Sequence, residues 1–434
     1  MPHRLLAFAR AKRRLLAILA VVGPGLITAT VDNDSGGIAT YSLAGALYGF
    51  DLLWTLIPIT FLLIVTMEMS TRLGAATGQG LADLLRERFG VKVTFWMLLT
   101  VLLANYGTII SEFAGIASAI DICGNATGYP ELFTWLKYLI IPLLTFGIWK
   151  LITEYDYKKI EKFFLISIIF YFAYPVSAYL AKPDWGNAMK ALVIPTWRFD
   201  AGYFFTMIGV IGTTITPWMQ FYLQSTLIEK GITLKDYDDA KWEVGLGCIT
   251  TDVISFFIIV ACAVTLNFTP GAPPVSSIDD IGKALIPLAG SYAGYLFALG
   301  LFNASLFGAA ILPLSTAFAI CEGMGWERGM NKTYDEAPWF YWIFSSLLIT
   351  GAATVLIPGI SFLYLGVMRV SQVAQGLILP PFLYFLVKLG DDRSLLGEYV
   401  NPPWLSRASW ICVYILTIID LILLGATLKE LVIG

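Results

Sequence analysis

An Asp-Asn-Asp triplet at positions 32–34 interrupts an apolar stretch that runs from residue 23 to residue 49, and Gly36 and Gly37 follow it closely. A carboxylate at the centre of a membrane-spanning helix costs about 2.5–3.5 kcal/mol on insertion scales, and glycine lowers helix propensity. The stretch therefore predicts two half-helices that flank an unwound polar turn. In transporters, such a turn binds an ion near the middle of the membrane through freed carbonyls and one or two carboxylates. The alternative is a polar loop between two short helices, but each half is too short to span a bilayer alone.

The composition is that of an integral membrane protein. Of the 434 residues, 57% are hydrophobic and 14% are charged, which is more apolar sequence than a soluble chain of this length needs. The net charge of −3 does not favour a nucleic-acid partner. The five cysteines form no CxxC pair and predict neither a disulfide framework nor a zinc site. The basic and then apolar start resembles a signal peptide but lacks a small-residue cleavage site, so we interpret it as a retained first helix.

Apolar windows predict an all-α fold with about eleven membrane-spanning helices. The predicted spans are residues 15–49 (interrupted), 51–72, 93–122, 132–151, 160–181, 201–229 (interrupted), 241–268, 290–322, 338–357, 361–388 and 408–430. Most of the 28 Lys and Arg residues then fall on the same side as the N-terminus, which predicts that this side is cytoplasmic. We expect a multi-pass protein of the cell membrane.

A second interruption lies in residues 208–226, where Gly212, Thr213, Thr216 and Pro217 break an apolar run. Pro217 has no amide hydrogen and frees a carbonyl one turn earlier, near Thr213. For this helix alone, an ordinary proline kink is the simpler interpretation. Because the first and sixth spans are both broken at mid-span, the pattern favours two inverted five-helix repeats. The predicted organisation is a cytoplasmic tail (1–14), a first repeat (15–200), a second repeat (201–390) and an additional helix (391–434).

These segments resemble the NRAMP family of divalent-metal transporters over roughly residues 20–390. In the first span, GPG is followed after eight residues by DSGGIAT at positions 34–40, where the family's unwound turn reads Asp-Pro-Gly-Asn. Similar matches are RLG at 72–74, TG at 77–78 and RER at 86–88 around the end of the second helix, and SQV at 371–373 with LP at 379–380 in the tenth. The resemblance implies a LeuT-like 5+5 inverted repeat with broken helices 1 and 6.

The chain departs from the family pattern at positions that bind metal in the family. Asp34 keeps the metal-binding carboxylate, but Gly37 replaces the asparagine ligand and Thr216 replaces the methionine whose sulfur touches the metal. On the third helix, only Glu112 remains of the family's Asp-x-x-Glu. In addition, Trp218 and Gln224 replace the family's histidines after that methionine. The ninth helix has no arginine between Pro338 and Pro358. The one histidine of the chain is His3.

These exchanges change the metal that the resemblance implies. A thioether favours transition metals over hard ions, whereas Thr216 leaves only oxygen donors around Asp34. Glycine at position 37 also removes a side chain and is expected to widen the cavity. A wide, all-oxygen site suits Mg²⁺, which dehydrates reluctantly and keeps several waters. The chain thus looks most like the NRAMP-related magnesium transporters, which carry Mg²⁺ and Mn²⁺.

The resemblance implies a site with one charged direct ligand and several neutral oxygens. The predicted metal-site residues are Val31, Asp34, Gly37, Glu112, Thr213, Thr216 and Gln372. Asp34 is expected to bind the ion directly, Glu112 to hold its water shell, and Gln372 to occupy the place of an occasional tenth-helix ligand. Structural roles are the alternatives: a helix N-cap for Asp34, buried hydrogen bonds for Glu112 and Gln372, and threonine hydroxyls that bond back to the backbone.

Proton coupling needs groups that titrate along a path, and histidine is the usual one near neutral pH. Since His3 lies in the tail, we expect uptake driven by the membrane potential, without obligatory proton transport. A proton-coupled Mn²⁺ or Fe²⁺ importer is the alternative, and a sodium-coupled carrier of an organic substrate is a more distant one. The acidic turn would repel a substrate carboxylate. No HExxH, GxSxG or P-loop pattern predicts an enzyme.

Several polar residues in apolar spans fall outside this site. Asp32 and Asn33 are interpreted as caps or vestibule groups, and Asp252 as the cap of a helix turn. Arg369 is expected to pair with a carboxylate or to lie near the cytoplasmic end, and Asp420 receives no assignment. We expect a monomer in the lipid bilayer with no cofactor, because the transported Mg²⁺ or Mn²⁺ is the substrate.

Overall fold

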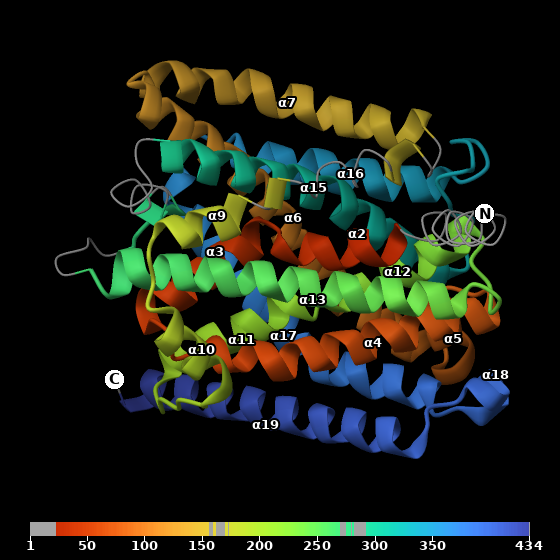
Figure 1. The fold of residues 1–434 in the computed structure, drawn as a ribbon. Helices are drawn as coiled ribbons and strands as arrows, with labels where there is room; N and C mark the ends of the chain where they lie inside the picture. Colours follow the sequence, from red (N-terminus) through yellow and green to blue (C-terminus); the bar gives the residue numbers. More distant parts are fainter. Residues whose placement is uncertain are drawn as a thin grey trace, which may run out of the picture.

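The computed structural model describes residues 23–155, 159–161, 170–171, 173–269, 275–278, 280–281 and 292–433, and these residues form an all-helical bundle (Figure 1). The elements are α2 (Pro24–Thr30), η1 (Val31–Asn33), α3 (Ser35–Tyr48), η2 (Leu53–Thr55), α4 (Leu56–Thr77), α5 (Leu81–Phe89), α6 (Val91–Thr127), α7 (Pro130–Glu154), α9 (Ala173–Leu180), α10 (Trp185–Val193), α11 (Ala201–Thr214), α12 (Pro217–Lys230), α13 (Tyr237–Cys262), η4 (Ala263–Asn267), α15 (Tyr292–Met324), α16 (Pro338–Val355), η5 (Ser361–Leu363), α17 (Tyr364–Gly390), α18 (Arg393–Leu396), η6 (Gly397–Tyr399) and α19 (Pro403–Ile433).

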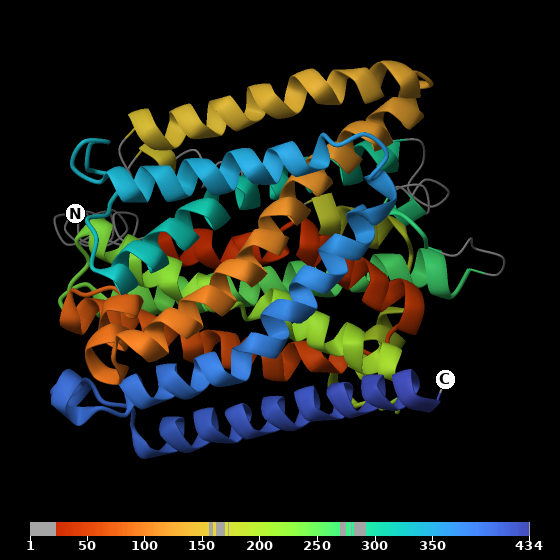
Figure 2. The same ribbon diagram turned by 180° about the vertical axis from the view of Figure 1, so that it is seen from behind.

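The long helices lie side by side, with α7 and α19 on opposite outer faces (Figures 1 and 2). Eight of the described helices are long and apolar enough to cross a membrane, and the broken pairs α2/α3 and α11/α12 add to them. The predicted spans that fall on described residues are confirmed to within about five residues at each end. The tail, the start of the first span and most of the fifth lie outside the described residues.

The first break is built by Asp34. After α2, the chain tightens into the single 3₁₀ turn η1, and Asp34 then adopts an extended backbone as the N-cap of α3. Its Oδ1 accepts a hydrogen bond of 2.6 Å from the Gly37 amide. A side-chain N-cap satisfies one of the free amides at a helix start, so the same carboxylate that predicts the break also begins the second half-helix.

The second break lies at Ile215 and Thr216, which have non-helical backbone angles between α11 and α12. Pro217 occupies the first turn of α12, where its missing amide hydrogen costs nothing, and it disfavours helical geometry in the residue before it. The end of α11 packs against η1, so the two breaks meet inside the bundle. The prediction of two interrupted helices is confirmed.

Gly212 sets the distance between α11 and α17, and Gly212→Val is expected to lower the thermal unfolding midpoint by several degrees. A Cβ at Gly212 would lie 2.2 Å from the carbonyl oxygen of Gln372 and 2.3 Å from the nitrogen of Gly376. These are backbone atoms that cannot rotate away, and overpacking of this kind costs about 1–3 kcal/mol. Thermal unfolding of the purified protein measures the effect.

The matched control is Gly147→Val on α7, where an added Cβ meets no described atom within 4 Å. This variant is expected to unfold close to the wild-type temperature. If the two variants were equally stable, the close crossing of α11 and α17 would not be a constraint on the fold.

Candidate metal site

The predicted metal-site residues gather where the two breaks meet, and all are buried. They lie on η1 (Val31), at the start of α3 (Asp34 and Gly37), on α6 (Glu112), around the second break (Thr213 and Thr216) and on α17 (Gln372). The six residues other than Gly37 are at most 3% exposed. In this conformation the site is therefore closed to solvent.

Asp34 and Gln372 contact each other across the first break. The Gln372 amide nitrogen donates to Asp34 Oδ1 over 3.5 Å, and this same oxygen accepts from the Gly37 amide. Gly36 makes the approach of α17 feasible, because a Cβ there would lie 1.9 Å from Gln372 Nε2. Neither bond uses Asp34 Oδ2, which is the carboxylate oxygen that an ion could take.

Gly37 does not widen the site in this conformation, so that prediction is wrong here. A Cβ at position 37 would lie 2.4 Å from the carbonyl oxygen of Asp32, 2.9 Å from Thr213 Oγ1 and 3.3 Å from Asp34 Oδ1. The missing side chain is thus replaced by the close approach of a carbonyl, a hydroxyl and a carboxylate oxygen. An asparagine could not occupy this position without moving them.

Glu112 lies beside Asp34 on the α6 side. Its Oε2 accepts a hydrogen bond of 3.2 Å from the Ser35 amide at the start of α3, and the two carboxylates are close enough to interact. Gly308 on α15 leaves space for this side chain, since a Cβ there would lie 2.5 Å from Oε2. Glu112 therefore adds a second carboxylate next to the broken helix.

Buried oxygen atoms without a hydrogen-bond partner surround the breaks. Among the described residues, these atoms include Thr213 Oγ1, Thr216 Oγ1, Glu112 Oε1 and Gln372 Oε1. By contrast, the Thr214 hydroxyl bonds back to the Val210 carbonyl over 2.8 Å, as threonines in helices commonly do. Leaving a buried polar group unsatisfied costs about 1–3 kcal/mol. These all-oxygen groups thus suit a hard cation together with water molecules that it carries.

Sequence reasoning missed a polar network on the other side of the first break. Asp32 Oδ2 accepts a hydrogen bond of 3.0 Å from the Thr251 hydroxyl on α13, and the Tyr41 hydroxyl lies 3.3 Å from the same oxygen. Asn33 donates to Thr251 over 2.5 Å and accepts from Ser255 over 3.0 Å. Thr251 and Ser255 lie one turn apart in an apolar span, and this spacing is the signal that could have identified them.

Two other sequence interpretations concern Asp252 and Arg369, and the one for Asp252 is wrong. Asp252 is not a cap, because it lies inside α13. Arg369 has no carboxylate partner within the part of the chain that the structure describes, and its guanidinium carbon instead lies 5.3 Å from the ring centre of Phe205. It lies near the Tyr364 end of α17, at the opposite end of this helix from Lys388.

A network of ion pairs closes the bundle at the end where α5 lies. Glu322 on α15 accepts hydrogen bonds from the Ser225 hydroxyl of α12 (2.6 Å), the Ala82 amide of α5 (3.3 Å) and Arg328 (3.1 Å). Arg328 also pairs with Asp83. Burial alone would lower the pKa of the Arg328 guanidinium, but Glu322 and Asp83 outweigh it and raise this pKa. Arg328 therefore stays charged and holds these elements together.

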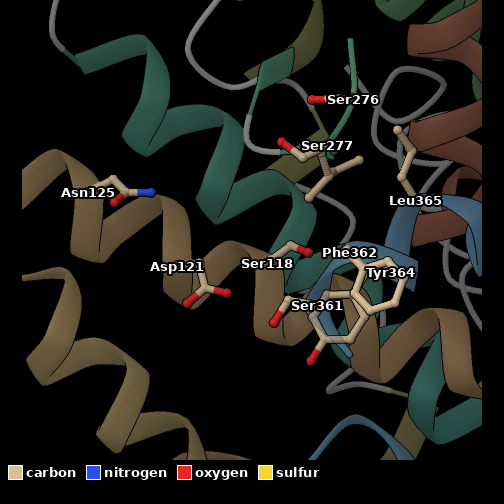
Figure 3. A pocket seen from close by; sticks show the side chains of 10 residues that line it. Ser118, Asp121, Asn125, Ser276, Ser277, Ser361, Phe362, Tyr364 and Leu365 are labelled. Carbon is tan, nitrogen blue, oxygen red and sulfur yellow. The ribbon is translucent and has the colours of Figure 1, made fainter. Parts of the chain in front are cut away.

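A separate cavity of about 240 Å³ lies at the C-terminal end of α6 (Figure 3). Ser118, Asp121 and Asn125 of α6 line it together with Ser361 and Tyr364. Asp121 forms an ion pair of 2.7 Å with Lys137 of α7. Since none of the predicted metal-site residues lines this cavity, it is distinct from the candidate site.

Broken first and sixth helices that meet at buried oxygen atoms define the class of protein: a membrane transporter with a LeuT-like fold. The chain belongs to the Nramp family, because the family described as "Natural resistance-associated macrophage protein-like" matches residues 25–426.

Solved transporter structures show the same fold. The manganese transporter of Eremococcus coleocola, in complex with an aromatic bis-isothiourea compound, superposes with a TM-score of 0.76 at 20% identity, over 93% of this chain and 86% of that one. A histidine mutant of this transporter gives 0.76 at 19% identity, over 95% and 88%. MhsT in complex with L-phenylalanine gives 0.55 at 17% identity, over 93% and 98%.

Proposed function

We propose that this protein carries Mg²⁺, and also Mn²⁺, across the cell membrane by alternating access, with the ion partly hydrated. Membership of the Nramp family supports the transport of divalent metal ions. The observation that carries the preference for Mg²⁺ is the chemistry of the buried donors. Asp34, Thr213 and Thr216 present only oxygen atoms where the two broken helices meet, and oxygen donors favour hard ions.

Each residue of the proposed site has a distinct role. Asp34 Oδ2 binds the ion directly and supplies the negative charge. The hydroxyls of Thr213 and Thr216, the amide oxygen of Gln372 and the free Glu112 oxygen accept hydrogen bonds from the water molecules that remain on the ion. Backbone carbonyls freed by the breaks, near Val31, Gly37 and Thr213, are the other available donors.

Alternating access would require the half-helices to move about the two breaks. One half-helix is anchored, because Glu243 Oε1 of α13 accepts hydrogen bonds of 2.7 Å from the amides of Gly23 and Leu26 at the start of α2. With a cytoplasmic N-terminus, as the Lys and Arg distribution favours, this anchor and the Glu322 network both lie on the inner side. Release of the ion into the cell would require both to separate. We further propose that the repeats are 15–200 and 201–390 and that one chain transports by itself.

Competition between metals tests the proposed selectivity. In liposomes that take up Mn²⁺ through the wild-type protein, an excess of Mg²⁺ is expected to suppress uptake strongly, because both ions use the same oxygen donors. Thr216→Met adds a thioether at the site and should weaken inhibition by Mg²⁺ several-fold while strengthening inhibition by Cd²⁺. The Thr216 hydroxyl has no described partner, so the substitution breaks no hydrogen bond seen here.

Thr134→Met, on the exposed face of α7, is the matched control and should behave as wild type. If wild-type uptake of Mn²⁺ were indifferent to a large excess of Mg²⁺, the protein would be a transition-metal carrier, and the proposed preference would be wrong.

A further inference from the structure

A groove of about 290 Å³ lies between α4, α11 and α19, and its walls are apolar. Among the described residues that line it, none is charged, and the one hydroxyl, that of Thr55, gives its proton to the Leu52 carbonyl over 2.7 Å. Cavities that offer water no polar partners stay dry. This apolar groove therefore suits a hydrocarbon ligand and not a hydrated ion.

The apolar groove opens to the surface of the bundle that faces the bilayer. Pro58, Trp197 and Ile415 line it and are exposed, whereas Met207 and Ile215 at its back are 1% and 0% exposed. The helices α4 and α19 are candidate membrane spans, and α19 lies along the outside of the bundle (Figure 1). The nearest source of a hydrocarbon chain is therefore a membrane lipid.

The apolar groove reaches from the edge of the membrane to its middle. At one end, the rings of Trp54 and Trp197 have centres 4.8 Å apart, and tryptophan is enriched at the membrane interface. At the other end, Ile215 belongs to the second break. Between residues 207 and 215 a helix rises by about 12 Å, and half of the hydrocarbon core of a bilayer is about 15 Å thick. The groove thus spans most of one leaflet.

A cationic side chain lies at the interfacial end of the apolar groove. Arg198 directly follows Trp197 and is half-exposed, and its Nε and Nη2 contact Asp51 Oδ2 over 2.6 and 2.5 Å. A guanidinium has five N–H donors in a fork that matches phosphate oxygens, so this ion pair does not use all of them. A phospholipid would find a partner for its phosphate where its acyl chain enters the groove.

We propose that the apolar groove binds one acyl chain of a phospholipid from the leaflet that contains Trp54 and Trp197. The phosphate contacts Arg198, the chain lies between α11 and α19, and its end contacts Ile215. Because Ile215 directly precedes Thr216, the lipid tail touches the second break itself. The inference goes beyond the proposed function and depends on neither the transported metal nor the transport mechanism.

Photolabelling of the full-length protein in liposomes tests this site. The probe is a phosphatidylcholine with a diazirine at the end of one acyl chain, and peptide mass spectrometry locates the labelled residues. Label is expected within residues 207–215, all of which are buried, as well as at exposed positions of α7 such as Leu139 and Leu143. Label on α7 and on the exposed face of α19, with none within 207–215, would overturn the proposal.

Two variants fill the apolar groove with an indole ring. Leu416→Trp and Cys412→Trp, both in its lining, should each reduce the label within 207–215 at least ten-fold and leave the label on α7 unchanged. The matched control is Ile418→Trp, which is on the same helix, is 56% exposed and does not line the groove; it should be labelled as the wild type is. Thermal unfolding identifies the variants that fold. Wild-type label within 207–215 in a folded groove-filling variant would contradict binding in the groove.

A third variant tests the headgroup contact. Arg198→Gln should reduce the label within 207–215 several-fold, because the phosphate loses its charge-assisted hydrogen bonds. Lys190→Gln, which removes an exposed cation from the neighbouring helix α10, is the matched control and should leave the label unchanged. Equal labelling of the two variants would overturn the assignment of the phosphate to Arg198.

Discussion

Asp34→Asn is expected to reduce Mn²⁺ uptake into liposomes about 100-fold. The amide side chain can still accept the hydrogen bond from the Gly37 amide that caps α3, so the broken helix should persist. What the variant loses is the negative charge that faces the ion. Removing one partner of a buried charge pair costs about 3–5 kcal/mol, and each 1.4 kcal/mol is tenfold in affinity.

The experiment compares Asp34→Asn with Asp420→Asn, which changes the same functional group on the peripheral helix α19. Uptake by the Asp420 variant should equal that of the wild type. Thermal unfolding of both purified variants confirms that they are folded. Wild-type rates in Asp34→Asn would remove this residue from the transport site.

Uptake is expected to follow the membrane potential and to leave the pH inside the liposomes unchanged. A doubly charged ion gains about 4.6 kcal/mol on moving inward across 100 mV, twice the value for a single charge. At equilibrium this corresponds to roughly 10³-fold accumulation. A potassium gradient with valinomycin sets the potential, and a Mg²⁺ indicator and a pH indicator inside the same liposomes record the two ions.

A proton ionophore is the control for coupling, since it collapses any proton gradient and should not slow uptake at a fixed potential. Liposomes with Asp34→Asn protein give the background leak. Acidification of the interior in proportion to metal uptake would instead identify a proton-coupled importer. The physical reason for expecting no coupling is the lack of a histidine beyond His3 in the tail.

The course of the main chain could be predicted because its breaks arise from local chemistry. Pro217 cannot continue α11, and the Asp34 carboxylate caps α3. Both effects act over one helical turn, so they can be recognised from the sequence alone. The apolar windows identify the spans for a similar reason, since the bilayer fixes the length that each helix needs.

The detailed geometry of the site depends on contacts between distant segments and could not be predicted in the same way. Gly37 suggests open space, but the carbonyl of Asp32 and the hydroxyl of Thr213 fill it. Asp252 resembles a cap in the sequence, and only the packing of α13 against α4 shows that it is buried inside a helix. The type of a residue indicates which hydrogen bonds or metal contacts its side chain can make, whereas the surrounding residues determine which of these it makes.

Anomalous diffraction from crystals soaked in Mn²⁺ tests most directly whether a hard ion binds where the broken helices meet. We predict a peak about 2.0–2.2 Å from an Asp34 carboxylate oxygen, between the 31–37 turn and Thr213 to Thr216, with water in most of the other coordination positions. A soaked crystal with Mn²⁺ bound elsewhere, and no metal at Asp34, would contradict the account.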